Sequence, residues 1–303
     1  MSWLESPFVE IDVKDVYNKD EKLKKEDVDT LKDWLKKTPH LPPVTELQIV
    51  LFLHSCYYNI ELSKRTIDVY FTTRTLSQDI FGSRTIRDPA LSTALKCGLS
   101  VVLPELTPKG EAVIMCKLMH PDSALYDSAG QFKMFDVCTH LYLHKRGPAE
   151  AVQMVMDMDQ STFGHLLKVT PSVVRRTLYY LQEGMPIRLK CIHIINVVPF
   201  LDKALALIKP FMKKELYDSI KIHSDIRTLY EYVPKDMLPS DYGGSCESAS
   251  TLHGKLIDLI SNTDDFHRFQ ESQLIDKSKR PKLEDFEQSL FGASGSFKKL
   301  EVD

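Results

Sequence analysis

The sequence predicts an α/β protein with a helical unit at its N-terminal end. From about residue 99 onward, short apolar runs of strand length alternate with longer segments of helical period. Before that point only helical periodicity is visible. A chain of 303 residues, 43% hydrophobic and 27% charged, is long enough for one large globular domain or two smaller ones. We expect a helical subdomain over 1–90, an α/β domain over 91–250, and a C-terminal region over 251–303.

Three helices are expected in the N-terminal region. Residues 21–38 place apolar side chains on one helical face, and the prolines that follow end this helix because proline has no backbone N–H. Thr45 is a suitable N-cap for a second helix, since its hydroxyl can accept a bond from a free backbone N–H. Residues 59–63 are expected to form a turn that leads into a third helix, Lys64–Arg74.

The α/β region alternates strands with helices. Two helices are expected between the strands, Phe132–His144 and one that opens at Pro171, where proline suits the first turn. The predicted strands are apolar runs bounded by turn residues. They are Leu99–Leu103, Ala112–Leu118, Ala151–Asp157, Arg188–Asn196 and Ile220–His223.

The C-terminal region begins with an amphipathic segment, 251–270, which is predicted to be one helix. From about residue 271 the chain is polar and charged, and it is rich in serine and glycine near Ser294–Ser296. We expect this last part to be a flexible tail.

The segment Val197–Met212 is the most distinctive in the chain, because a greasy helix is predicted directly after a buried strand. Its apolar side chains form two neighbouring stripes, and such a wide face must cover a core, a partner, a membrane or an apolar ligand. The apolar positions of this segment are Val197, Val198, Phe200, Leu201, Ala204, Leu205, Leu207, Ile208, Phe211 and Met212.

Composition argues against several classes of protein. The formal net charge of −3 does not favour bulk binding of nucleic acid. The six cysteines show no C-x-x-C spacing, so we expect reduced thiols and no zinc site. The N-terminus lacks the apolar run of a signal peptide, and no stretch approaches the roughly 20 apolar residues that span a bilayer. A cytoplasmic monomer is expected.

Catalytic motifs are not found either. The chain has no glycine-rich phosphate loop, H-E-x-x-H or EF-hand, so we predict no catalytic residue, metal or cofactor, and no enzyme. Asp157 and Asp159 end a strand, where catalytic carboxylates can lie, but bonding to backbone groups of a turn is the simpler expectation. His165, His193 and His223 occur singly and are expected to be hydrogen-bonded core histidines.

Six short motifs together resemble the CRAL-TRIO lipid-binding family, especially the branch of α-tocopherol transfer protein and cellular retinaldehyde-binding protein. They run in the family's order over about 90 residues. The last motif and the C-terminal helix are similar to insect members, and the leading helices resemble the family's N-terminal subdomain. The motifs are Val155–Asp159, Phe163–Leu166, Val169–Val173, Pro186–Asn196, Ile208–Phe211 and Leu238–Gly244.

The resemblance implies a mixed sheet floored by helices, one deep apolar pocket, and a lid formed by the helix after Asn196. It also implies a bulky lipophilic cargo of the tocopherol, retinoid or carotenoid class. When the lid is closed its apolar face covers the cargo, and when it is open the same face enters a membrane interface. The candidate pocket residues are Val155, Phe163, Leu166, Ile192, Ile194, Phe200, Leu201, Leu205 and Ile208.

The resemblance further implies a phosphoinositide site beside the lid. Arg188 and Lys190 match two of the four basic positions of the tocopherol branch, whereas the other two fall on Glu215 and Ser219. Lys209, Lys213 and Lys214 lie nearby in the sequence and can supply compensating charge. The expected partners are thus a lipophile and, transiently, an anionic membrane surface. A phospholipid exchanger and a protein-interaction module on the same fold are the alternatives.

Overall fold

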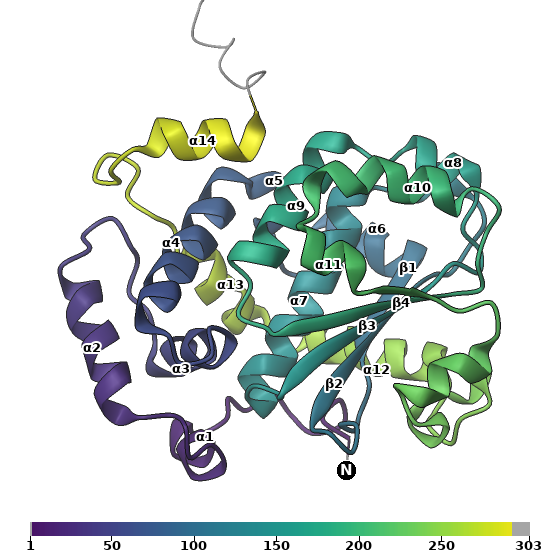
Figure 1. Cartoon of the computed structure of the whole chain (residues 1–303), viewed down its shortest axis with the longest axis horizontal. Helices are drawn as coiled ribbons and strands as arrows, with labels where there is room; N and C mark the ends of the chain where they lie inside the picture. The colour runs from purple at the N-terminus through teal and green to yellow at the C-terminus, as the bar shows by residue number, and fades with distance from the viewer. Residues whose placement is uncertain (1, 293–303) are drawn as a thin grey trace, which may run out of the picture.

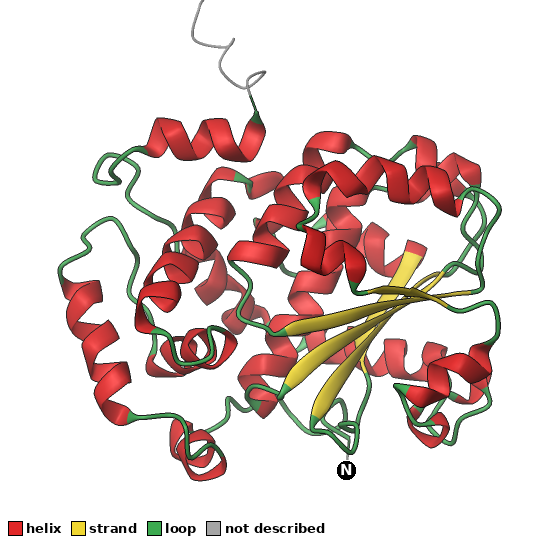
Figure 2. Cartoon of the chain, in the orientation of Figure 1, coloured by secondary structure: helices red, strands yellow, loops and turns green. Residues whose placement is uncertain are grey.

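The computed structural model describes residues 2–292, and its centre is a five-stranded sheet. The strands are β1 (Gly98–Val102), β2 (Glu111–Leu118), β3 (Ala151–Asp157), β4 (Leu189–Ile195) and β5 (Ile220–Ile222). They lie side by side in sequence order, with β1 antiparallel to β2 and the other pairs parallel. Figure 2 shows this twisted sheet among the helices. The predicted α/β class and mixed sheet are confirmed.

Helices connect the parallel strands, as crossover connections require. The short helix η1 (Ser123–Leu125) and α7 (Ser128–Arg146) join β2 to β3, and α8 (Phe163–Leu167) with α9 (Pro171–Glu183) join β3 to β4. The connection from β4 to β5 contains α10 (Leu201–Ile208), η2 (Lys209–Phe211) and α11 (Lys214–Asp218). After β5 come η3 (Ile226–Glu231), η4 (Lys235–Met237) and η5 (Ser240–Tyr242).

Four N-terminal helices lie to one side of the sheet (Figure 1): α1 (Val13–Lys19), α2 (Lys25–Lys36), α3 (Glu46–Ser55) and α4 (Ile60–Leu76). The short helix α5 (Gln78–Phe81) follows, and α6 (Pro89–Cys97) lies beside β1, which it directly precedes. Thr45 caps α3 as predicted, in a capping box with Gln48. The expected turn at 59–63 is wrong: Asn59 accepts a bond from the backbone N–H of Leu62 at 2.9 Å and starts α4 there.

One buried carboxylate joins the N-terminal helices to the α/β domain. Oδ2 of Asp136 on α7 lies 2.9 Å from Nη1 of Arg74 and 2.5 Å from Nη1 of Arg84, while Tyr180 of α9 donates to Oδ1 at 2.9 Å. Burial alone would raise the pKa of Asp136, but the two guanidinium groups hold it well below its usual range. The charges therefore persist in the core as a paired cluster.

The greasy helix is shorter than predicted. Its α-helical part is Leu201–Ile208, so Val197 and Val198 precede the helix, and Phe211 and Met212 lie in and just after the short helix η2. Pro210 explains the change of helix type, because it has no N–H to continue the α-helical bonding pattern. At the other end, Phe200 is the N-cap, and the N–H of Leu201 bonds to the carbonyl of Val198 at 3.1 Å.

The C-terminal region also differs from prediction. The single helix expected at 251–270 is two helices, α12 (Ala249–Ser261) and α13 (Asp264–Ser272). The expected flexible tail contains α14 (Leu283–Phe291), whose Phe286 packs against Tyr179 of α9 with ring centroids 5.8 Å apart. Leu290 is fully buried, so apolar residues at helical spacing fix this polar segment to the domain. The predicted serine-glycine stretch 294–296 lies outside the described residues.

Candidate functional site

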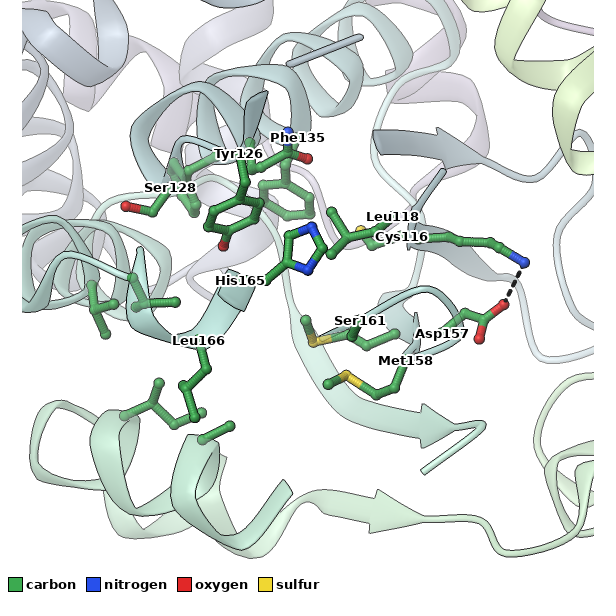
Figure 3. A pocket seen from close by; sticks show the side chains of 18 of the residues that line it. Cys116, Leu118, Tyr126, Ser128, Phe135, Asp157, Met158, Ser161, His165 and Leu166 are labelled. Carbon is green, nitrogen blue, oxygen red and sulfur yellow. Dashed lines mark ion pairs between the residues drawn. The ribbon is translucent and has the colours of Figure 1, made fainter. Parts of the chain in front are cut away.

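A cavity of about 370 Å³ lies between one face of the sheet and the helices α7, α8, α9 and α10. Its lining is largely apolar, and Figure 3 shows side chains that project into it from several elements. Four methionines, which adapt to irregular ligand shapes, are prominent in the lining. They are Met134, Met154, Met156 and Met158.

The sheet face of the cavity follows from strand alternation. Met154 and Met156 of β3 and Ile194 of β4 line it, and Met156 is directly paired with Ile194. Val155 lies between the two methionines, so it points to the opposite face and is wrong as a pocket residue. Ile192 is buried on the correct face of β4 but is not part of the cavity lining.

Helix α10 supplies one wall of the cavity. Phe200, Leu201, Ala204, Leu205 and Ile208 line it, so one continuous strip of the predicted apolar face points inward. Leu207, Phe211 and Met212 are partly buried but do not line the cavity, and Val197 is 43% exposed. The other side of α10 carries Asp202, Lys203 and Ala206, all exposed. The cavity strip therefore takes residues from both expected stripes, and the residues toward the end of the segment lie outside the lining.

Helix α8 lies at the end of α10 and gives the site an apolar rim. Leu166 lines the cavity as predicted, whereas Phe163 is 44% exposed and packs edge-to-face on Phe200 at 5.9 Å between centroids. Leu167 is 72% exposed and Leu125 of η1 is 55% exposed. Nζ of Lys168 donates to the carbonyl of Ala124 at 2.7 Å, which holds η1 beside α8. We call Leu125, Phe163 and Leu167 the apolar rim.

The segment that leads into α10 is fixed by a buried carboxylate. Asn196 has φ of 51°, in the left-handed region that asparagine tolerates better than most residues, and its Nδ2 donates to Asp157 at 2.8 Å. Lys117 lies 3.2 Å from the same carboxylate, and the Tyr242 hydroxyl donates to it at 2.5 Å. Oδ1 of Asp157 also accepts the backbone N–H of Asp159 at 2.8 Å, which confirms the predicted turn role.

The three single histidines differ in their bonding. His193 and His223 bond to each other at 2.9 Å, and their outer nitrogens bond to Gln153 and Thr228, which confirms them as core histidines. His165 lies in the cavity wall with only Nδ1 bonded, to the backbone N–H of Thr162 at 3.1 Å and to the Thr162 hydroxyl at 2.9 Å. Its Nε2 is buried and has no partner within residues 2–292. A buried unsatisfied donor of this kind costs about 1–3 kcal/mol.

Arg188 does not face the cavity or an open basic surface. Its side chain is 8% exposed, Nε donates to the carbonyl of His54 at 2.7 Å, and the guanidinium lies 4.3 Å from the Tyr57 ring centroid. Nη1 lies 3.6 Å from a carboxylate oxygen of Glu150. In this structure Arg188 therefore joins the sheet to the N-terminal helices.

The predicted lysines are more accessible but mostly paired. Lys190 is 51% exposed and bonds to Glu111, Lys213 is 55% exposed and bonds to Glu183, and Lys214 bonds to Asp218. Lys209 is exposed and lies 4.8 Å from the Tyr217 ring centroid. Glu215 is exposed and Ser219 is partly buried. Lys190, Lys213 and Lys214 each bond to a different acidic residue and share no ion-pair partner within the described chain.

Other kinds of site are not visible in residues 2–292. No three histidine, cysteine, aspartate or glutamate side chains in this range lie close enough to hold a metal ion. None of its helices has both the length and the apolar character needed to cross a bilayer. All six cysteines have free thiols, and burial raises the pKa of the cavity thiol Cys116 to about 11.

Two models of known protein families match successive parts of the chain. The model of the CRAL/TRIO domain matches residues 97–244, which contain the sheet and the cavity-forming helices. The model described as "Pinta-like, UBA domain" matches residues 20–91, the N-terminal helices. Together the two matches account for the helical region and the α/β region seen in the structure.

Individual relatives are distant in sequence. The alpha-tocopherol transfer protein-like protein of Mus musculus is 26% identical over 251 residues, which are 79% of this chain and 70% of that protein. Clavesin-2 of Rattus norvegicus is 25% identical over 204 residues, which are 65% of this chain and 61% of that protein. The crystal structure of Sfh5 is similar with a TM-score of 0.48 and 13% identity, over 75% of this chain and 90% of that one. The family matches and the motifs agree, and the chain belongs to the CRAL-TRIO family of lipid-binding and lipid-transfer proteins.

Proposed function

We propose that this protein carries one bulky lipophilic molecule, of the tocopherol, retinoid or carotenoid class, in the cavity under α10 and exchanges it with membranes. The observation that supports this most directly is the apolar strip of α10, from Phe200 to Ile208, which closes a cavity already walled by methionine and phenylalanine. Burial of apolar cargo surface there provides the driving force for binding. Cargo leaves when α10 moves, and no bond of the cargo is made or broken.

The size and charge of the cavity favour a single lipophile that is smaller than a phospholipid and has no phosphate. A volume of about 370 Å³ lies near the lower end of the roughly 300–1,000 Å³ that small-molecule pockets occupy. A phosphate headgroup inside the cavity would need unpaired positive charge. Lys117 is the lysine of the lining, and its Nζ is already held 3.2 Å from Asp157 and 3.0 Å from Asp159. The described lining thus offers no free cation for a phosphate.

The apolar rim supports a membrane-facing role for the α8 and α10 corner. Leu125, Phe163 and Leu167 expose apolar surface beside the cavity, and such clustered exposure marks an interaction site. Lys203 lies over the Phe163 ring at 5.3 Å, and Lys168 stands next to Leu167. Apolar side chains with lysines at their edge suit an anionic bilayer surface. We propose that this rim enters the bilayer interface while α10 opens.

Phosphoinositides would then act through exposed lysines rather than through Arg188. Lys190, Lys209, Lys213 and Lys214 lie on the strand and helices that flank α10 and expose their ammonium groups to solvent. A phosphate group can compete for lysines that are paired only at the surface, because surface ion pairs are weak. We propose that headgroup binding at these lysines loosens the segment after α10.

The test combines cargo identification with transfer. Native mass spectrometry of the purified chain, followed by organic extraction, should reveal a single apolar molecule that is not a phospholipid. Transfer of a fluorescent tocopherol analogue between vesicles should require Leu205, which lines the cavity, and should tolerate change at Ala206, which is exposed on the same helix. Leu205→Asp should therefore abolish transfer, and Ala206→Asp should retain it, with circular dichroism confirming both folds.

Three results would contradict the proposal. A co-purified phospholipid would support the exchanger alternative, and a protein bound to α10 with an empty cavity would support an interaction module. Equal transfer by Leu205→Asp and Ala206→Asp would show that α10 does not close the cargo site.

A further inference from the structure

The hydrogen-bonding of His165 fixes which of its ring nitrogens carries the proton. The backbone N–H of Thr162 points at Nδ1 from 3.1 Å, and an N–H group can only donate. Nδ1 must therefore accept, and in the neutral imidazole the proton then resides on Nε2. Burial lowers the pKa of His165, and the positive charge of Lys168 acts in the same direction, so the neutral form is favoured.

This Nε2–H group is buried without a protein acceptor. His165 is 4% exposed. Within the described chain its Nε2 is the one fully buried polar side-chain atom of the cavity lining that has no hydrogen-bond partner. Figure 3 shows the imidazole in the cavity between Tyr126 and Leu118. The Tyr126 ring stands edge-on to it, with centroids 5.3 Å apart and planes at 86°. Because Thr162 holds the Nδ1 edge, the opposite edge of the ring is the one that has no protein partner within the described chain.

Several other polar side chains of the lining are already bonded to the protein, whereas the hydroxyls of Tyr126 and Ser161 also line the cavity. Nε2 of Gln131 donates to the carbonyl of Ala94 at 3.4 Å, and the Thr177 hydroxyl donates to the carbonyl of Val173 at 2.9 Å. Lys117 is bound to two carboxylates. His165 thus holds the fully buried unbonded polar atom of a largely apolar described lining, and such a donor is strongly selective for a matching acceptor.

We propose that Nε2–H of His165 anchors the polar end of the cargo, so that the pocket selects lipophiles that bear a hydrogen-bond acceptor oxygen over plain hydrocarbons. A hydroxyl, a carbonyl or an ester can supply this oxygen, because each offers a lone pair to the donor. Tyr126, whose ring stands edge-on to the imidazole, is only partly buried, and it would have to move aside for the oxygen to reach Nε2. This inference rests on the proposed carrier function and narrows it to a class of cargo.

The tautomer is tested first, on the full chain labelled with ¹⁵N-histidine. Long-range ¹H–¹⁵N spectra should show His165 as the Nε2–H tautomer before cargo is added, and the Nε2 signal should shift when an oxygen-bearing cargo binds. A purely structural role for the ring would leave that signal unmoved. A His165 resonance of the Nδ1–H type, or no shift on binding, would overturn the proposal.

The selectivity is tested with three probes that share a twenty-carbon chain. Phytol has a hydroxyl, phytyl acetate has acceptor oxygens but no O–H, and phytane is the hydrocarbon. The wild-type chain should bind phytol and phytyl acetate about tenfold more tightly than phytane, the gain expected for one hydrogen bond. Binding of phytyl acetate shows whether the protein donates or accepts the hydrogen bond. The acetate has no O–H group, so only a donor on the protein can make it bind more tightly than phytane.

His165→Phe should bring phytol and phytyl acetate to the level of phytane while leaving phytane binding unchanged, and that unchanged binding shows that the pocket is folded. Thr177→Val, which alters a lining hydroxyl bonded to its own helix, should keep the wild-type preference. Equal affinity of wild type for all three probes, or a preference that survives His165→Phe, would overturn the anchor and leave the carrier function standing. Failure of the wild type to bind any of the three would overturn both.

Discussion

Phe163 of α8 and Phe200 at the start of α10 meet edge-to-face, with ring centroids 5.9 Å apart and planes at 77°. Phe200 lines the cavity, while Phe163 is 44% exposed at the rim. The pair therefore connects the cargo wall directly to the surface that we propose for membrane contact. A bilayer that draws Phe163 away from Phe200 would loosen the N-terminal end of α10.

Phe163→Ala removes the ring contact with Phe200 and should make α10 open more readily. An aromatic pair contributes about 0.5–1.5 kcal/mol, so amide exchange across residues 198–205 should quicken by roughly threefold to tenfold. Hydrogen–deuterium exchange followed by mass spectrometry measures this. Leu167→Ala on the same short helix is the control, and an equal effect of both changes would assign the loosening to α8 as a whole.

Leu125→Asp combined with Leu167→Asp should weaken binding to vesicles. Both side chains are more than half exposed, at 55% and 72%, so the fold should tolerate the change. Loss of inserted leucine surface should lower the partition coefficient by roughly tenfold or more. Sedimentation with anionic vesicles is the measurement. Val9→Asp, at a position 70% exposed and outside the rim, should bind as the wild type does; a similar loss there would indicate a charge effect alone.

Arg188→Ala should lower the free energy of unfolding by about 1–3 kcal/mol, because it removes the charged donor from the His54 carbonyl, which keeps only the Tyr57 N–H at 3.1 Å, and removes packing against Tyr57. Chemical denaturation monitored by circular dichroism gives the value. The exposed Arg227, which bonds to Asp225 two residues away, is the control, and Arg227→Ala should stay within about 0.5 kcal/mol of wild type. A stable Arg188→Ala chain with weakened binding to anionic vesicles would instead return Arg188 to the phosphoinositide site.

Asp157→Ala should free the segment that leads into α10. The carboxylate is buried and holds Asn196, Tyr242 and Lys117, so its loss should cost about 2–3 kcal/mol of unfolding free energy. It should also speed cargo release, measured by stopped-flow fluorescence. Asp159→Ala removes a more exposed partner of Lys117 and should affect both quantities much less. If Asp157→Ala and Asp159→Ala changed the stability and the release rate equally, Lys117 rather than Asp157 would be the residue that fixes this segment.

Stability should fall as the solution is acidified below about pH 6.5. Burial lowers the pKa of His140 to about 4 and that of His267 to about 3, with Arg84 contributing at His267. An unfolded histidine takes up its proton near pH 6.5, so between that pH and about 4 protonation favours the unfolded chain. His267→Gln should therefore reduce the loss between pH 7 and 4.5 by about 2 kcal/mol. A loss of stability between pH 7 and 4.5 that is as large in His267→Gln as in the wild type would contradict this assignment.

The sheet could be predicted from sequence because each strand is a short apolar run between turn residues, and burial on both faces requires that composition. The apolar strip of α10 was visible for a similar reason, since helical spacing groups Leu201, Leu205 and Ile208. Val155 was misplaced because an apolar run alone does not show which alternate residues face the cavity. The pairing of Met156 with Ile194 settles that parity.

Contacts between distant segments could not be predicted from local pattern. Arg188 looks like an exposed basic residue, yet His54, Tyr57 and Tyr58, more than a hundred residues earlier, surround it. The polar segment after residue 271 looked flexible because its few apolar residues have no partners nearby in the sequence. In the structure they pack against α9, which comes about a hundred residues earlier. The donor on His165 was hidden for the same reason, because a histidine next to Gly164 gives no sign of which nitrogen is bonded.

The Asp157 carboxylate gives three of the six sequence motifs a common physical origin. Asp157 lies in the motif Val155–Asp159, Asn196 closes Pro186–Asn196, and Tyr242 belongs to Leu238–Gly244, so one side chain binds three stretches that span 85 residues. Replacement of any one of Asp157, Asn196 and Tyr242 would leave a polar atom of its partner without a hydrogen bond. These positions are thus expected to be inherited as a set, and their joint presence is a better mark of descent than the low overall identity.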